Sequence, residues 1–283
     1  MARTSGMPQP ILDITDPEHR RAAAVAAAGG AGMFYAFGNF CALAAAPDAG
    51  TMERMNRLKG RPLSQVGSVT TTPDRASLVF DWARLPRTLG RGVIEALMAD
   101  FRSLGPIGFR GPAANLVPEH LTVDGTAQLI MPGDACPSNH LVGEVLERLG
   151  EDLLFITSAN TSSNVTRRVE AAHCEMRAIQ REFGHRPHVV LIGHRNERAV
   201  RRRYPHHQPC STSILAFHRE AGDGGRPALV LERLGSLDTE CVRRVCARRG
   251  LGLVVADTAR ERVPVRRPRT LTLPGAPLRL AMR

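Results

Sequence analysis

The sequence is almost without lysine. Its 283 residues include 38 Lys and Arg, yet Lys59 is the only lysine and every other such cation is arginine. An ammonium is a compact charge on a flexible stem, whereas a guanidinium is a wide planar fork. A lone lysine in such a composition is a candidate for holding a phosphate at close range in a narrow pocket. Taken by itself, a stray surface lysine is the simpler interpretation.

Other features are scarce as well, and each excludes a class of protein. Aromatic residues make up 4% of the chain, which argues against a stacking surface for single-stranded nucleic acid. No apolar run has the length of a membrane span, and the alanine-rich stretch at 22–28 lacks a cleavage pattern. The six cysteines form no CxxC pair and no dense framework. Reduced thiols and a cytoplasmic location are therefore expected.

Positive charge is abundant. The formal net charge is +11 and the pI is about 10.7, which favours anionic partners such as nucleotides, RNA or an acidic protein. Five arginines lie between Arg195 and Arg203. A solvated helix face is the first interpretation of this run, and contact with tRNA or ATP phosphates is the alternative.

Lys59 begins the motif Lys59-Gly60-Arg61-Pro62 at the end of an amphipathic run, whose Met52, Met55 and Leu58 recur at helical spacing. Gly60 suits the left-handed residue that closes a helix, and Pro62 favours an extended Arg61. Side chains two apart on extended backbone point the same way. The motif thus predicts two cations converging beyond a helix end, as a grip for a polyphosphate.

The order of elements predicts an α/β fold with a mixed sheet. Helices are expected over residues 17–28, 51–58, 89–102, 141–149, 166–183 and 237–249. Strands are expected over residues 33–43 (broken at 38–39), 68–72, 127–131, 153–156, 188–192, 213–218, 228–231 and 251–256. A loose N-terminal arm (1–14), one domain (15–257) and a basic tail rich in Pro and Arg (258–283) complete the chain. The tail is expected to be dispensable for a nucleotide site.

A second polar cluster follows a buried strand. The apolar run at 153–156 is typical of a central strand, and it leads directly into Thr157-Ser158-Ala159-Asn160. Open α/β sheets bind ligands at the carboxyl ends of their strands, which makes Ser158 and Asn160 candidate ligand contacts. A plain strand-ending turn, for which Ser and Asn are common residues, is the alternative.

Taken together, the order of these pieces resembles the YrdC-like family of threonylcarbamoyl-adenylate synthases. Its KxR motif corresponds to Lys59 and Arg61, and its SxN motif to Ser158 and Asn160. A proline-serine-threonine strand start is approximated by Pro209-Cys210-Ser211-Thr212, and an arginine-x-glycine turn by Arg233-Leu234-Gly235. The resemblance extends over roughly residues 15 to 256 and implies an open, twisted mixed sheet, flanked by helices, with a basic concave face.

The resemblance also implies a reaction. An amine takes up bicarbonate to give a carbamate, whose oxygen attacks the α-phosphate of ATP and expels pyrophosphate. Lys59 and Arg61 would be catalytic, and Ser158, Asn160, Ser211 and Arg233 would join them around ATP. Mg²⁺ would arrive with the ATP, and a partner enzyme would pass the carbamoyl group to an acceptor, which in the family is tRNA. Such chemistry needs charge neutralisation and positioning more than a general base.

The departures from the family concentrate on its amino-acid side. The stretch Phe37-Gly38-Asn39-Phe40-Cys41-Ala42 keeps almost nothing of the family's first long strand, and 104–108 lacks the first proline and the threonine of a family turn. Ile130 stands where the family has an arginine for the amino-acid carboxylate. Asn39, Ile130 and Arg110, a replacement cation reaching in from a loop, are thus candidate substrate-pocket residues. Because buried polar groups reject ligands that leave them unpaired, we expect an amine other than plain L-threonine.

Two other functions stay open. The first is ordinary threonylcarbamoyl-adenylate synthesis for tRNA modification, with replacement residues in the pocket. The second is a non-catalytic RNA-binding module that keeps the basic face. A zinc site from Cys136 and His140 with His206, His207 and Cys210 fits no closed ligand spacing, so no metal site is predicted.

Overall fold

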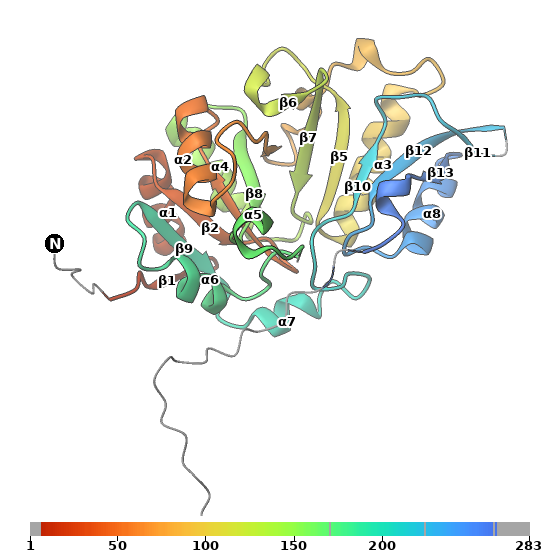
Figure 1. Ribbon diagram of the computed structural model, residues 1–283. Helices are drawn as coiled ribbons and strands as arrows, with labels where there is room; N and C mark the ends of the chain where they lie inside the picture. Colours follow the sequence, from red (N-terminus) through yellow and green to blue (C-terminus); the bar gives the residue numbers. More distant parts are fainter. Residues whose placement is uncertain (1–6, 170, 224, 263, 265–283) are drawn as a thin grey trace, which may run out of the picture.

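The computed structural model describes residues 7–169, 171–223, 225–262 and 264. Within them, thirteen strands form one mixed sheet with the path β1-β9-β2-β3-β8-β4-β7-β5-β10-β12-β11 (Figure 1), while β6 pairs with β7 and β13 with β12. The bounds of the strands are β1 Ile11–Asp13, β2 Gly32–Ala36, β3 Cys41–Ala45, β4 Ser68–Thr70, β5 Ile107–Pro112, β6 Thr122–Val123, β7 Thr126–Met131, β8 Leu154–Ser158, β9 Val189–Gly193, β10 Ile214–Ala216, β11 Gly222–Asp223, β12 Arg226–Arg233 and β13 Gly252–Val255.

Helices begin where the sequence supplies caps. Asp16 accepts hydrogen bonds from the first turn of α1, and Asp48 accepts one from Thr51 in α2. The left-handed Gly60 (φ 68°) ends α2, as its position in the motif predicted. The bounds of the helices are α1 Pro17–Ala28, α2 Ala49–Lys59, α3 Arg91–Leu104, α4 Ser138–Leu149, α5 Ser163–Thr166, α6 Met176–Phe183, α7 Glu197–Arg201 and α8 Thr239–Arg248.

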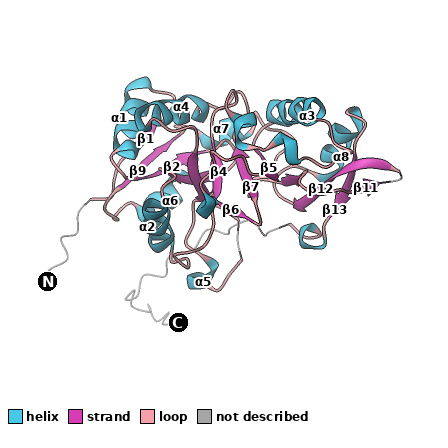
Figure 2. Cartoon of the chain, turned by 90° about the horizontal axis from the view of Figure 1, so that it is seen from above, coloured by secondary structure: helices cyan, strands magenta, loops and turns pink. Residues whose placement is uncertain are grey.

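Apolar side chains pack on both faces of the sheet. Alternation along β2 separates them, since Phe34 belongs to one buried cluster while Met33 and Tyr35 belong to the other. The helices follow the same division, since buried side chains of α2, α3 and α6 belong to the cluster of Phe34 and those of α1 and α4 to the other cluster. Seen from above, α1 and α4 lie on one side of the sheet and α2 and α6 on the other (Figure 2). None of the described helices combines the length and apolar character that a membrane crossing requires.

The predicted α/β class and mixed sheet are confirmed, but several elements differ. The strand expected over 33–43, with a break at 38–39, is the antiparallel pair β2 and β3, because the predicted break is a turn in which Gly38 has a φ of 98°. The expected long helix 166–183 was wrong, since only its last part forms α6 and its first residue ends the short α5. The strand β5 was missed, as its glycines and terminal proline resemble a loop.

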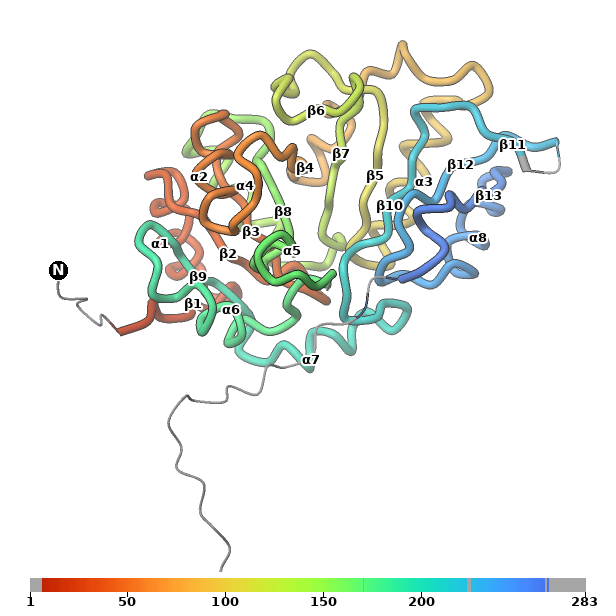
Figure 3. The backbone as a smooth tube through the Cα atoms, in the orientation of Figure 1, coloured from red at the N-terminus to blue at the C-terminus, as the bar shows by residue number. Residues whose placement is uncertain are grey.

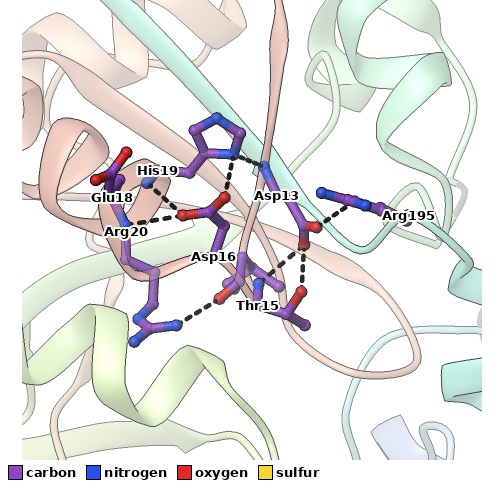
Figure 4. A network of polar contacts seen from close by, with 8 residues as sticks. Asp13, Thr15, Asp16, Glu18, His19, Arg20 and Arg195 are labelled. Atoms are coloured by element: carbon purple, nitrogen blue, oxygen red, sulfur yellow. Dashed lines mark hydrogen bonds and ion pairs between the residues drawn. The ribbon is translucent and has the colours of Figure 1, made fainter.

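The folded part begins before residue 15. Within the segment expected to be an arm, β1 pairs in parallel with β9, and the two run side by side in the tube view (Figure 3). Asp13 at the end of β1 accepts hydrogen bonds from Thr15 and forms an ion pair with Arg195, whose Nε lies 2.5 Å away (Figure 4). Arg195, the first residue of the arginine run, therefore contacts the end of the N-terminal strand β1.

The segment after residue 257 also joins the fold. Ala259 is fully buried, and Arg262 Nε donates to the carbonyl oxygen of Gly235 at 2.6 Å. The carbonyl oxygen of Pro264 accepts a hydrogen bond from Ala171. The rest of the predicted tail, 265–283, lies outside the described residues.

Candidate active site

A cavity of about 200 Å³ brings together residues that are far apart in the sequence. They come from the turn after α2, the end of β8, the loop before β10, the end of β12 and the strands β5 and β7. Most of the predicted site residues line it, namely Arg61, Arg110, Ile130, Ser158, Ser211 and Arg233, with Ser68, Gln128, Thr157 and Thr212 among their neighbours. The three that do not are Lys59, Asn160 and Asn39.

Two arginines face this cavity without a carboxylate partner. Among the described residues, no ion pair joins Arg61 or Arg233 to an acid, and burial lowers the pKa of Arg61. Burial also lowers the pKa of Arg233 to about 10, while its guanidinium donates to the backbone oxygen and Oγ1 of Thr212, both at 2.7 Å. Desolvated guanidinium groups of this kind favour an anionic ligand.

Lys59 lies directly behind the cavity wall. Its side chain is fully buried, and Nζ donates to Thr157 Oγ1 at 2.9 Å, to Ser158 Oγ at 3.3 Å and to the Ser158 carbonyl oxygen. Arg61 lines the cavity while Lys59 braces the strand end that forms one side of it. The two cations of the motif are therefore joined to one site, although their side chains occupy different positions in it.

The loop after β8 is held by the motif and by α6. Ser162 N donates to the Lys59 carbonyl oxygen, and Thr161 N donates to Glu182 Oε1 at 2.6 Å. Burial alone would raise the pKa of Glu182, but hydrogen bonds from His173 and Thr161 outweigh it and lower the pKa to about 2. Asn160 does not line the cavity, and its Nδ2 donates to the Thr161 carbonyl oxygen.

The loop that carries Ser211 is fixed from behind. Asn39 is almost fully buried and donates to the backbone oxygens of Gln208 (2.9 Å) and Cys210 (3.5 Å), so it lies outside the cavity wall. Position 235 requires glycine because the backbone of Thr212 lies very close to it, and a Cβ there would lie 2.2 Å from the carbonyl carbon of Thr212. The arginine-x-glycine turn thus packs directly on the loop before β10.

Arg110 enters the cavity from a strand rather than from the loop that the sequence indicated. On β5 it faces Gln128 of β7, and its Nη2 donates to Gln128 Oε1 at 2.8 Å. Gln128 Nε2 in turn donates to Ser68 Oγ at 2.6 Å. Arg110 Nε lies 3.0 Å from Glu232 Oε2. Ile130 also lines the wall, two residues along β7 from Gln128.

Sequence reasoning missed the neutral polar residues of the wall. Gln128 and Ser68 carry no motif of their own. The role of Gln128 follows from the pairing of β7 with the missed strand β5, and that of Ser68 from the pairing of β4 with β8. Thr157 had a signal, since it opens the polar cluster that follows the buried run at 153–156. Thr212 had a signal, since it follows Ser211 in the strand-start motif.

The other clusters lie elsewhere. Arg195 pairs with Asp13, and Arg201 Nη1 donates to the Cys174 carbonyl oxygen at 2.7 Å, so part of the arginine run has structural partners. Within the described part of the chain, no group of three or more His, Cys, Asp or Glu is placed to hold a metal ion.

No protein-family model and no curated protein matches the sequence. Solved structures do match. A variant of P. abyssi Sua5 with two alanine substitutions is 17% identical, with a TM-score of 0.61 over 87% of this chain and 65% of that chain. The chain has the Sua5/YrdC fold. P. abyssi Sua5 complexed with L-threonine gives 16% identity and a TM-score of 0.58 over 89% and 65% of the two chains.

A hypothetical protein of Streptococcus mutans UA159, smu.1377c, is 14% identical, with a TM-score of 0.60 over 89% of this chain and 98% of that one. The present chain thus spans about 65% of the length of the two Sua5 chains and nearly all of the shorter protein. These similarities confirm the fold expected from the motifs.

Proposed function

We propose that this protein forms a carbamoyl-adenylate from ATP, bicarbonate and an amine, releasing pyrophosphate, and that the amine is not plain L-threonine. The observation that carries the proposal is the convergence of Arg61, Ser158, Ser211 and Arg233 on one cavity, with no acid paired to either arginine among the described residues. The Sua5/YrdC fold supports the same class of reaction.

The residues of the cavity fit a polyphosphate. Arg61 and Arg233 would neutralise phosphate charge from two sides, and the hydroxyl groups of Ser158 and Ser211 would donate hydrogen bonds. Lys59 would hold the Ser158 backbone and could release its longest contact, to Ser158 Oγ, when a phosphate arrives. Mg²⁺ would come with ATP as part of the substrate.

The reaction then needs positioning more than proton transfer. The amine nitrogen bonds to the carbon of bicarbonate with loss of water, giving a carbamate. A carbamate oxygen attacks the α-phosphorus, and the bond to the bridging oxygen of the β-phosphate breaks to release pyrophosphate. Fixed cations around the phosphates stabilise the negative charge that shifts toward pyrophosphate during this step. A separate carbamoyl-transfer enzyme would consume the adenylate, and tRNA is a candidate final acceptor.

L-Threonine itself is the second candidate amine. P. abyssi Sua5 has been solved with L-threonine, and Arg110 gives this cavity a cation near the apolar Ile130. The altered segment at 37–42 favours another amine, because Phe40 adds bulk to the cavity wall where the resembled family has small polar groups.

The test is pyrophosphate release from ATP and bicarbonate over a panel of amines that includes L-threonine. We expect turnover with at least one amine, little with L-threonine, and a loss of about tenfold or more in ATP affinity for Arg61→Ala and Arg233→Ala. Arg57→Ala is the matched control, because Arg57 is exposed on α2 two residues before Lys59. Efficient turnover of L-threonine would overturn the substrate claim, and no turnover with any amine would overturn the reaction.

A further inference from the structure

A second hollow lies on the surface where α3 and α8 meet, away from the cavity described above. It is an open groove of about 590 Å³, and it shares no lining residue with the cavity. The two helices contact each other and lie side by side in the view from above (Figure 2). The lining combines apolar and positively charged side chains, namely Leu104, His206, Cys241, Arg244, Ala247 and Arg248.

The spacing of residues on α8 produces one wall of this groove. Arg244 and Arg248 follow the buried Cys241 by three and seven residues, which places all three on one side of the helix. Both arginines are exposed, and so is Ala247, whose side chain is a single methyl group. The wall therefore presents two guanidinium groups beside a short apolar side chain.

These two guanidinium groups have no carboxylate partner. Among the residues that the structure describes, no ion pair joins Arg244 or Arg248 to an acid. Hydrogen bonding by Arg249 lowers the pKa of Asp100, and the charge of Arg248 makes a smaller contribution. Both carboxylate oxygens of Asp100 are nevertheless occupied by Arg249, through Nε at 2.7 Å and Nη2 at 2.8 Å. The groove thus keeps a positive excess, which favours an anionic partner.

The turn that carries His206 into the groove is tied to the start of α8. His207 forms an isolated antiparallel bridge with Leu237, two residues before the helix begins. The Nδ1 atom of His207 lies 2.9 Å from Ser236 Oγ, and its backbone N–H donates to the Tyr204 carbonyl oxygen at 3.0 Å. These contacts place His206 at the groove before a partner arrives, so little conformational freedom is lost on binding.

We propose that this groove docks an acidic, amphipathic segment of a partner protein. Its carboxylates would pair with Arg244 and Arg248, and an apolar side chain would pack against Leu104 and Ala247. Charge complementarity favours carboxylates, and the apolar part of the lining favours a protein segment over an inorganic anion. The lining contains no Phe, Tyr or Trp on which a nucleobase would stack. The inference goes beyond the proposed reaction and does not depend on it.

Fluorescence anisotropy on the full-length protein tests the groove with a labelled synthetic peptide, a helix that carries Leu along one face and Glu on both flanks. Two control peptides replace every Glu by Gln or every Leu by Ser. The first peptide should bind about tenfold or more tightly than either control, because only it offers both kinds of contact. Arg244→Glu and Arg248→Glu should each weaken its binding about fivefold or more, since a like charge then faces the peptide.

Two further variants make the test specific. Arg243→Glu is the matched control, because Arg243 neighbours Arg244 but pairs with Glu240 at 2.9 Å and does not line the groove. It should leave the affinity for the peptide within about twofold of wild type. Ala247→Arg adds a positive charge but fills the groove, so it should weaken binding, whereas a purely electrostatic attachment would be strengthened. Circular dichroism verifies that each variant folds.

The inference is overturned if the first peptide binds no more tightly than the controls, if Arg243→Glu weakens binding as much as Arg244→Glu, or if Ala247→Arg strengthens it. Displacement of the peptide by inorganic tripolyphosphate or an RNA duplex at lower concentration than by unlabelled peptide would also overturn it, because the groove would then take another kind of anion. The assay contains no ATP, so a protein that releases no pyrophosphate leaves this result unaffected.

Discussion

Among the described Lys and Arg residues, only Lys59 is fully buried. This position explains why the chain keeps one lysine among so many arginines. The space behind the cavity wall holds a compact ammonium group with three donors. Thr157 and Ser158 receive those donors through two hydroxyl groups and one backbone oxygen. A planar guanidinium could not satisfy the same acceptors without moving the end of β8.

Lys59→Arg should therefore reduce both stability and ATP affinity. Overpacking a well-filled site costs about 1–3 kcal/mol in the free energy of unfolding, and urea denaturation measures it. Arg57→Lys, an exposed change on the same helix, should leave both quantities unaltered. Wild-type stability and ATP affinity in Lys59→Arg would show that the buried ammonium has no special fit.

Some helix and strand boundaries are set by local sequence features, and others are set by pairing with distant strands. The caps of α1 and α2 are local, so Asp16, Pro17 and Gly60 placed those ends correctly from the sequence. The carboxyl end of β8 was placed two residues early, at 156 instead of 158, because the polar Thr157 and Ser158 continue the strand after its apolar run. In contrast, β5 contains two glycines and a proline, and only its pairing with β7 and β10 makes it a strand.

Long-range strand pairing also limited what could be predicted of the candidate site. Motif residues such as Arg61, Ser158 and Arg233 could be predicted to share a cavity, and they do. The positions of Gln128 and Glu232 beside Arg110 could not, since cross-strand register is set by the whole sheet. Asn39 was a plausible pocket residue by position, yet the turn between β2 and β3 directs it to backbone oxygens instead.

The contact between α6 and the loop after β8 should depend on pH. The pKa of Glu182 is about 2 in the folded protein and lies below its ordinary value of 4.5. The contact therefore stabilises the fold fully above about pH 4.5, and its contribution is lost as the pH falls toward 2.

Glu182→Gln should accordingly be less stable than wild type at pH 7, by roughly 2–3 kcal/mol at most. The difference should shrink progressively in unfolding measurements below pH 4.5. Glu147→Gln, which changes an exposed carboxylate on α4, provides the control. A difference that stays constant down to pH 2.5 would place the role of Glu182 in packing rather than in charge.

On the scale of the whole molecule, the chain after α8 returns to the neighbourhood of the site. Arg262 donates a hydrogen bond to the carbonyl oxygen of Gly235, close to Arg233 in the chain, and the carbonyl oxygen of Pro264 accepts one from Ala171, in the segment between α5 and α6. The expectation that everything after residue 257 is dispensable is therefore best tested in two steps.

A chain that ends at Asp257 should lose thermal stability and ATP affinity, because it lacks buried Ala259 and the contact to Gly235. A chain that ends at Pro264 retains those contacts and should bind ATP as the full-length protein does. Calorimetry on both truncated proteins, with circular dichroism to verify folding, distinguishes the two segments. Equal ATP affinity in all three proteins would make the contact at Gly235 irrelevant to the site.

The path of the sheet has a consequence for how the protein is made. Strand β1 pairs with β9, and β5 pairs with β10. The earlier strand of each pair therefore stays unpaired until a partner much later in the sequence has been synthesised. The cavity itself is incomplete until Arg233 has left the ribosome. Sheets built from such distant pairings fold slowly and expose unpaired edges in the meantime. A nucleotide that binds only the finished cavity would favour the completed sheet by mass action, so the cell's ATP would help to close the last stage of folding.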